Sequence, residues 1–171
     1  MADDGDCADE VRLAGEQVAL APVTASEAAA VRRIARTPQV RSRWGDEDPL
    51  DDPSACKFAI LLGGTVVGMV QYHEETTPGY RHAGLDIFVD PGQHGRGIGR
   101  DAIRALARYL ISERGHHRLV IDPAADNEPA IRCYAAAGFR PVGVMRQYER
   151  DADGRGWHDG LLMDLLAGEL D

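Results

Sequence analysis

The stretch from Leu85 to Arg114 constrains the fold more than any other, because a strand, a glycine loop and a helix follow one another in it. Leu85 to Val89 has the apolar and aromatic composition of a short strand, and an Asp-Pro-Gly turn ends it. The helix after the loop has apolar residues at helical spacing, namely Ile103, Leu106, Leu110 and Ile111. A strand–loop–helix unit is therefore expected in the middle of the chain.

The glycine loop has a physical use at the start of a helix. Gly95, Gly97 and Gly99 alternate there, and a backbone without Cβ atoms can approach a ligand closely. The first N–H groups of a helix have no partner within it and attract anions. Arg96 and Arg100 add positive charge, so we expect a phosphate or pyrophosphate. The spacing is neither that of a dinucleotide fold nor of a P-loop. A glycine turn without a ligand is the alternative.

Two motifs resemble one known family. The run from His94 to Gly99 resembles the acetyl-CoA pyrophosphate loop of the GCN5-related N-acetyltransferase (GNAT) family, with His94 where Gln or Arg is usual. A later stretch resembles the family's Asn-x-x-Ala-x-x-x-Tyr-x-x-x-Gly-Phe signature at every fixed position, which are Asn127, Ala130, Tyr134, Gly138 and Phe139. Both motifs occur in the family's order.

The resemblance implies an α/β (α+β) fold with a mixed, mostly antiparallel central sheet of about six to seven strands, a parallel splayed pair, and about four flanking helices. Residues 1–15 are expected to be an acidic flexible tail and residues 16–171 a single domain of this family. The expected strands are 18–23, 58–62, 65–74, 85–89, 117–122, 139–150 and 157–166. The expected helices are 28–36, 39–44, the one after the glycine loop, and 127–137.

The resemblance also implies the reaction, which is direct transfer of an acetyl group from acetyl-CoA to an amine. A backbone N–H near Phe88 or Val89 would bind the thioester carbonyl, and Tyr134 would protonate the leaving thiolate. The alternative is that Asn127 only caps its helix and Tyr134 only packs. The implied cofactor-binding residues are Phe88, Val89, His94, Gly95, Arg96, Gly97, Ile98, Gly99, Arg100, Asn127, Ala130 and Tyr134.

Two carboxylates are candidates for handling the amine. Asp86 lies within an expected strand and Asp122 ends the next one, where buried strands rarely carry charges. If the two strands are neighbours, both side chains can face the acceptor amine, so both are predicted to be catalytic and substrate-binding. The alternatives are that Asp122 caps the turn before Pro123 and that Asp86 pairs with an arginine.

A narrower resemblance covers about residues 40 to 145. The runs Arg-Trp-Gly-Asp-Glu at 43–47, Leu-Asp-Ile-Phe at 85–88, Ile-Asp-Pro at 121–123 and Ala-Ile-Arg-Cys-Tyr at 130–134 resemble aminoglycoside 6′-N-acetyltransferases. It implies that Asp86 and Asp122 contact amines of the drug. Trp44 would supply a flat apolar wall, and Tyr72 a further acceptor contact. An acidic rim is expected from Asp46, Glu47 and Asp48, with a solvated acidic loop as the alternative.

The charge balance agrees with a cationic substrate. The net charge is −9, which favours a polycationic amine and argues against nucleic acid or an anionic membrane as partner. The histidines lack metal-ligand spacing, and no apolar run resembles a signal peptide or membrane span, so we expect no metal and a cytoplasmic monomer or homodimer. The competing functions are acetylation of a protein N-terminus, polyamine or small metabolite amine, and CoA binding without turnover.

Overall fold

The computed structural model describes residues 10–171, and residues 1–9 of the predicted tail lie outside the described residues. The sheet has eight strands in the order β1-β2-β3-β4-β5-β6-β8-β7. The strands are β1 (Leu13–Ala14), β2 (Ala19–Pro22), β3 (Cys56–Leu62), β4 (Thr65–Glu75), β5 (His82–Val89), β6 (Arg118–Ile121), β7 (Arg140–Arg150) and β8 (Trp157–Leu166). The α-helices are α1 (Ala25–Ala35), α2 (Pro38–Trp44), α3 (Ile98–Ser112) and α4 (Glu128–Ala137).

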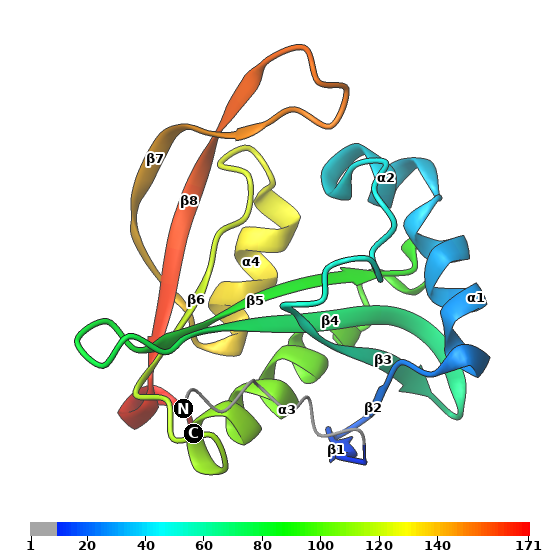
Figure 1. Cartoon of the computed structure of the whole chain (residues 1–171), viewed down its shortest axis with the longest axis horizontal. Helices are drawn as coiled ribbons and strands as arrows, with labels where there is room; N and C mark the ends of the chain where they lie inside the picture. The colour runs from blue at the N-terminus through cyan, green and yellow to red at the C-terminus, as the bar shows by residue number, and fades with distance from the viewer. Residues whose placement is uncertain (1–9) are drawn as a thin grey trace.

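The sheet divides between β5 and β6, which form its one parallel pair among the described residues. These strands are paired only where Ala83 faces Leu119 and Gly84 faces Val120. Beyond Gly84 they separate, and β6, β8 and β7 rise away from the flatter group β3–β5 (Figure 1). We call the edge of β5 at residues 85–89, which faces this separation, the splayed edge. The predicted mixed sheet with a parallel splayed pair is thus confirmed.

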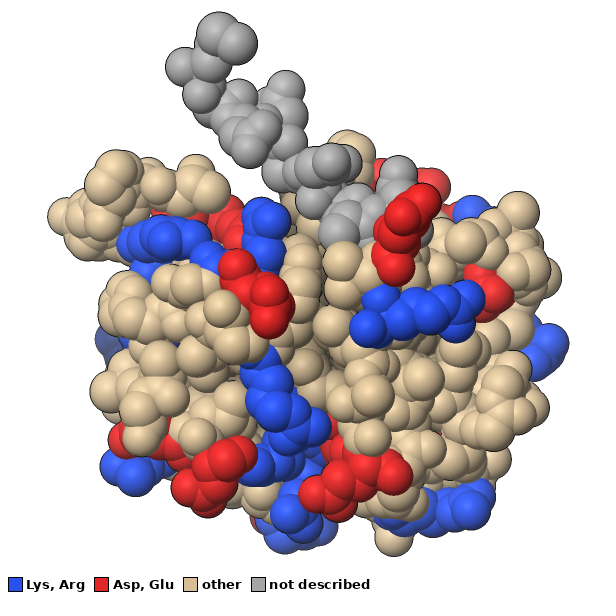
Figure 2. Space-filling model, turned by 90° about the horizontal axis from the view of Figure 1, so that it is seen from below, with Lys and Arg blue, Asp and Glu red and all other residues tan. Residues whose placement is uncertain are grey.

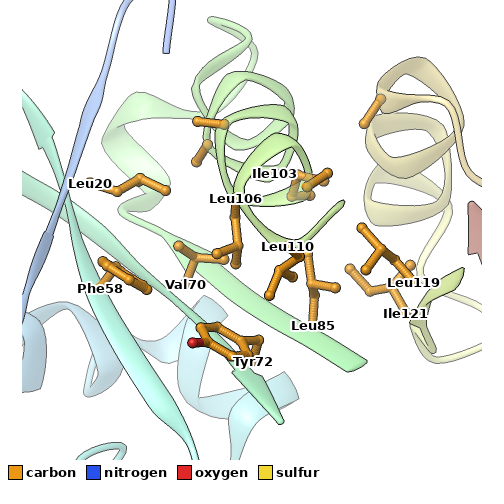
Figure 3. Packing of buried hydrophobic residues seen from close by; sticks show 14 of the residues in the cluster. Leu20, Phe58, Val70, Tyr72, Leu85, Ile103, Leu106, Leu110, Leu119 and Ile121 are labelled. Atoms are coloured by element: carbon orange, nitrogen blue, oxygen red, sulfur yellow. The ribbon is translucent and has the colours of Figure 1, made fainter. Parts of the chain in front are cut away.

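Helices cover both faces of the sheet. The α3 face holds the larger core, where Leu106 and Leu110 of α3 lie against Val70 and Leu85 of the strands (Figure 3). The other face holds a smaller cluster in which residues of α1 and α2 surround Phe88. No helix among residues 10–171 is long and apolar enough to span a bilayer.

The prediction of about six to seven strands is too low by one short strand. Leu13–Ala14 forms β1 and pairs with β2 through Leu13 and Leu20, inside the segment predicted to be a tail. A two-residue strand carries too short a pattern to be recognised from sequence. Helix α1 also starts earlier than predicted, at Ala25, where the Glu27 carboxylate accepts the Thr24 N–H at 3.0 Å.

Candidate active site

The glycine loop has the backbone form that its sequence predicts. Gly95 and Gly97 both have φ of 76°, in the left-handed region that favours glycine. Gly97 is the N-terminal cap of α3, and no side chain caps this helix, so its first N–H groups remain available to an anion. Ile98 is 2% exposed and belongs to the core, so only its backbone can serve the loop.

The buried carboxylate of Asp101, in the first turn of α3, connects the start of this helix to residues 16–18. Asp101 accepts the N–H groups of Glu16, Gln17 and Val18 at 2.8, 2.7 and 2.9 Å. Burial opposes the charge, but these three hydrogen bonds outweigh it and hold the pKa of Asp101 below its usual range. The Gln17 side chain then donates to the Arg96 carbonyl at 3.4 Å. This role of Asp101 is not predictable from the helix pattern, because nothing in that pattern connects Asp101 to residues some 85 positions earlier.

Gly97→Ala should weaken acetyl-CoA binding, because a Cβ disfavours the left-handed conformation by about 1–2 kcal/mol. We expect the KM for acetyl-CoA to rise roughly five- to thirtyfold, with the KM for the acceptor unchanged. Gly115→Ala is the matched control, since Gly115 has φ of 71° and lies in the loop after α3. Initial-rate kinetics on both variants test this. Equal changes in the two variants would show that the loop conformation serves folding alone.

The α3 side of the molecule carries basic side chains among acidic ones. Figure 2 views this side of the molecule and shows basic side chains in a line near the middle of a mixed surface. Arg104 is held by the carbonyls of Ala137 and Asp171 at 3.3 and 2.9 Å, whereas Arg100 in the first turn is exposed. Arg100 is therefore placed to add charge where the N–H groups of α3 emerge.

The strand register decides between the two predicted carbonyl-binding donors. The Asp90 N–H donates to the Val67 carbonyl of β4 at 2.7 Å, and backbone groups alternate sides along a strand. The Phe88 N–H thus faces β4, and the Val89 N–H faces away from β4, towards the splayed edge. The Val89 carbonyl on that side accepts a hydrogen bond from His94 Nε2 at 2.9 Å. The Phe88 ring packs edge-on against Trp44, with centroids 4.9 Å apart.

The structure brings the three predicted catalytic side chains, Asp86, Asp122 and Tyr134, near enough to one another for their charges to interact. Burial and the negative charge of Asp122 raise the pKa of Asp86, whose side chain is still 43% exposed and open to an acceptor. Burial, with the charges of Cys133, Asp86 and Asp122, raises the pKa of Tyr134 above its usual range. Tyr134 therefore remains a protonated phenol near neutral pH, which suits a proton donor.

Several polar side chains in this region are not among the residues predicted from the sequence. The Gln71 amide donates to Asp86 at 3.3 Å, and its buried oxygen has no hydrogen-bond partner among residues 10–171. His73 lies between Asp52, at 2.8 Å, and Asp86, at 3.9 Å. A spacing of two residues on β4 puts Gln71 and His73 on the face of Asp86, so the strand pattern could have revealed them. Nothing in the sequence pattern indicates Tyr148, whose hydroxyl donates to Asp122 at 2.6 Å.

The prediction that Tyr72 contacts the acceptor is wrong for this structure. Tyr72 is 2% exposed and packs in the α3 core, with its ring 6.4 Å from those of Phe58 and Tyr109. It is paired with Leu85 in the β4–β5 ladder and so points to the face opposite Asp86. A one-residue difference along a strand moves a side chain to the other face.

The predicted acidic rim is partly neutralised by arginines. Asp46 forms an ion pair with Arg41, and Asp48 forms one with Arg32 at 2.7 Å. Glu47 is exposed between them. The rim therefore offers less negative charge than its sequence suggests.

The remaining predicted residues frame the site. Asn127 caps α4 by accepting the Ala130 N–H at 3.4 Å, so the capping alternative describes its contact in the structure. Arg43 at the end of α2 reaches Asp126, just before α4, at 2.7 Å. This exposed pair links α2 to the loop that carries Asn127.

The chain is similar in sequence to known acetyltransferases. Residues 26–139 match the family model described as the acetyltransferase (GNAT) family. Aminoglycoside N(6′)-acetyltransferase type 1 of Klebsiella pneumoniae is 32% identical over 108 residues, which cover 56% of this chain and 53% of that protein. N-alpha-acetyltransferase RimI of Mycobacterium tuberculosis (strain ATCC 25618 / H37Rv) is 36% identical over 89 residues, which cover 52% of this chain and 54% of that protein. The chain thus matches about half the length of these relatives.

The fold is similar to that of solved structures over nearly the whole chain. AAC(6′)-Ib, solved in complex with paromomycin and acetyl-CoA, aligns with a TM-score of 0.73 and 24% sequence identity. The alignment covers 90% of this chain and 97% of that one. At this identity the likeness concerns the fold.

Proposed function

The chain belongs to the GNAT acetyltransferase family, and on that premise we propose that it transfers the acetyl group of acetyl-CoA to the 6′-amine of an aminoglycoside. The observation that carries the proposal is the grouping of Asp86, Asp122 and Tyr134 beside the splayed edge. Two carboxylates attract an amine-rich acceptor, and a neutral phenol is placed to donate a proton. The relative from Klebsiella pneumoniae, named for this activity, supports the choice of acceptor.

The residues present fit acetyl-CoA, which supplies the thioester when bound. The N–H groups at the start of α3, with Arg96 and Arg100, would hold its pyrophosphate. The Val89 N–H, facing the splayed edge, would stabilise negative charge that develops on the thioester oxygen. Tyr134 would protonate the departing sulfur.

The carboxylates would act on the acceptor. An ammonium group must lose a proton before it can attack, and near neutral pH most free amines are protonated. Asp86 has a raised pKa and is in contact with Gln71 and near His73, so it can accept a proton and pass it towards the exposed side of the site. Asp122 would orient the amine. Burial raises the pKa of the Cys133 thiol, which disfavours an acetylated cysteine and favours direct attack within a ternary complex.

Acetylation of a protein N-terminus is the second candidate, and the RimI relative favours it. Polyamines and small metabolite amines share the same chemistry. All these activities use the same loop around Gly97, so cofactor binding does not distinguish them. A CoA-binding module without turnover is the alternative of another class, and the grouping of Tyr134 with two carboxylates argues against it.

An acceptor screen tests the proposal. CoA release from acetyl-CoA would be measured with an aminoglycoside, spermidine, and a short peptide with a free N-terminus, each at matched concentration. We expect the highest kcat/KM for the aminoglycoside. A higher value for the peptide or polyamine would replace the proposed acceptor, and tight CoA binding with no release for any amine would favour the module without turnover.

A further inference from the structure

An irregular segment of β7 lies directly beside the acceptor carboxylate. Between the pairs Met145–Gly160 and Glu149–His158, three residues of β7 face only one residue of β8, Asp159. Gln147, within this bulge, has φ of 47° and is the only non-glycine residue among 10–171 with a positive φ. Such a conformation costs energy and persists where its surroundings impose it.

The surroundings of the bulge hold it in one form. The Asp159 carboxylate accepts the Gln147 N–H at 2.8 Å. Next along the chain, Tyr148 turns back over β8 at Gly160, where a Cβ would lie only 2.9 Å from Cδ1 of its ring. A residue larger than glycine at position 160 would therefore displace the ring.

The Tyr148 side chain passes over β8 at Gly160 and so reaches the side of β8 on which Asp122 lies. The loop after Asp122 runs along β8, with the Leu161 N–H donating to the Pro123 carbonyl and the Ala125 N–H donating to the Asp159 carbonyl, both at 2.8 Å. The Tyr148 hydroxyl reaches across and donates to Asp122 Oδ2 at 2.6 Å. The bulge at Gln147, the absence of a side chain at Gly160 and the loop after Asp122 thus together place the Tyr148 hydroxyl against one oxygen of the Asp122 carboxylate.

The other groups that face Asp122 are acidic or neutral. They are Asp86 from β5, Tyr134 from α4 and Glu149 from β7, and His158 of β8 pairs with Glu149 at 3.4 Å. The Tyr148 hydroxyl is therefore the hydrogen-bond donor that Asp122 meets among these groups, and this hydrogen bond, with burial, raises the pKa of Tyr148 to about 12.

We propose that Tyr148 is a positioning residue of the acceptor site, whose hydroxyl occupies Oδ2 of Asp122 and leaves Oδ1 to a single amine of the substrate. The inference rests on the proposed N-acetyltransferase function. A carboxylate held by one donor has a fixed orientation, so it receives one ammonium or amine group in a defined place. Tyr148 makes no contact with the reacting atoms in this account.

Tyr148→Phe tests the proposal, because it removes only the hydroxyl. We expect kcat/KM for the acceptor to fall about tenfold, with the KM for acetyl-CoA within about twofold. Gly160→Ala should reproduce these changes, and the double variant should be no worse than either single one. Tyr80→Phe is the control, because Tyr80 is 76% exposed and lies in the loop before β5.

A second readout does not depend on knowing the acceptor. A crystal structure of Tyr148→Phe should show the Asp122 carboxylate without a fixed orientation, even if no aminoglycoside is acetylated, whereas Tyr80→Phe should leave that orientation unchanged. An Asp122 carboxylate that keeps its orientation in Tyr148→Phe overturns the proposal, as does a variant in which thermal stability and both substrate affinities fall together.

Discussion

Replacing Tyr134 with Phe should lower kcat by roughly 10²–10⁴-fold, the range that general acid catalysis contributes. The side chain is buried and its pKa lies above the usual range, because burial and the nearby charges of Cys133, Asp86 and Asp122 disfavour the phenolate. It therefore carries a proton throughout the neutral range and can give it to the leaving sulfur. The KM for acetyl-CoA should change by less than about threefold, since the loss is confined to the transition state.

Single-turnover and steady-state CoA release measure this effect. Tyr109→Phe is the matched control, because Tyr109 is also a buried tyrosine but packs in the α3 core against Tyr72. The control should retain kcat. An unchanged kcat in Tyr134→Phe would remove Tyr134 from the mechanism, and a loss shared by the control would point to packing.

Asp101→Ala should lower the free energy of unfolding by about 3 kcal/mol, because it leaves three backbone N–H groups without their charged acceptor. Chemical denaturation followed by circular dichroism measures the loss. Asp153→Ala is the control: Asp153 is exposed and accepts a single N–H, that of Arg155, at 2.9 Å. Its loss should be below about 1 kcal/mol. Equal losses in the two variants would contradict the anchoring role.

The pH dependence of Asp101→Ala follows from the lowered pKa of Asp101. A carboxyl with a folded-state pKa below its unfolded value of about 4 stabilises the fold fully above that value. The stabilisation is lost as the pH falls through the folded-state pKa. The difference in unfolding free energy between the natural protein and Asp101→Ala should thus be constant near neutral pH and narrow below about pH 4. A difference that widens in acid would contradict this assignment.

The parts of the site that lie within one continuous stretch were predictable from sequence. The glycine loop and the turn into α3 depend on local chemistry, and Gly97 has the left-handed φ that a glycine there suggests. The start of α4 is similarly local, since Asn127 is its cap. In each case the residues that decide the structure are neighbours in the chain.

Features that join distant segments were not predictable in this way. Asp101 binds a turn that lies more than 80 residues earlier, and its role depends on the packing of α3 against that turn. Tyr72 was assigned to the wrong face because only the register with Leu85 fixes the direction of its side chain. Tyr148 reaches Asp122 through a bulge that breaks the two-residue period on which strand prediction relies.

The net charge of the acidic rim was also harder to predict from the sequence than the position of its residues. The sequence predicts that Asp46 and Asp48 form an unpaired acidic rim. In the folded chain, Arg41 forms an ion pair with Asp46 and Arg32 forms one with Asp48. In the proposed reaction, acceptor binding is therefore expected to depend mainly on Asp86 of β5 and on Asp122, which follows β6.

The central claim, acetylation of an aminoglycoside at its 6′-amine, is tested most directly with two matched acceptors. CoA release from acetyl-CoA would be measured with an aminoglycoside that bears a 6′-amine and with a close analogue that bears a 6′-hydroxyl. We expect release with the amine alone. Release with both compounds would contradict the assigned position, and release with neither would contradict the assigned acceptor.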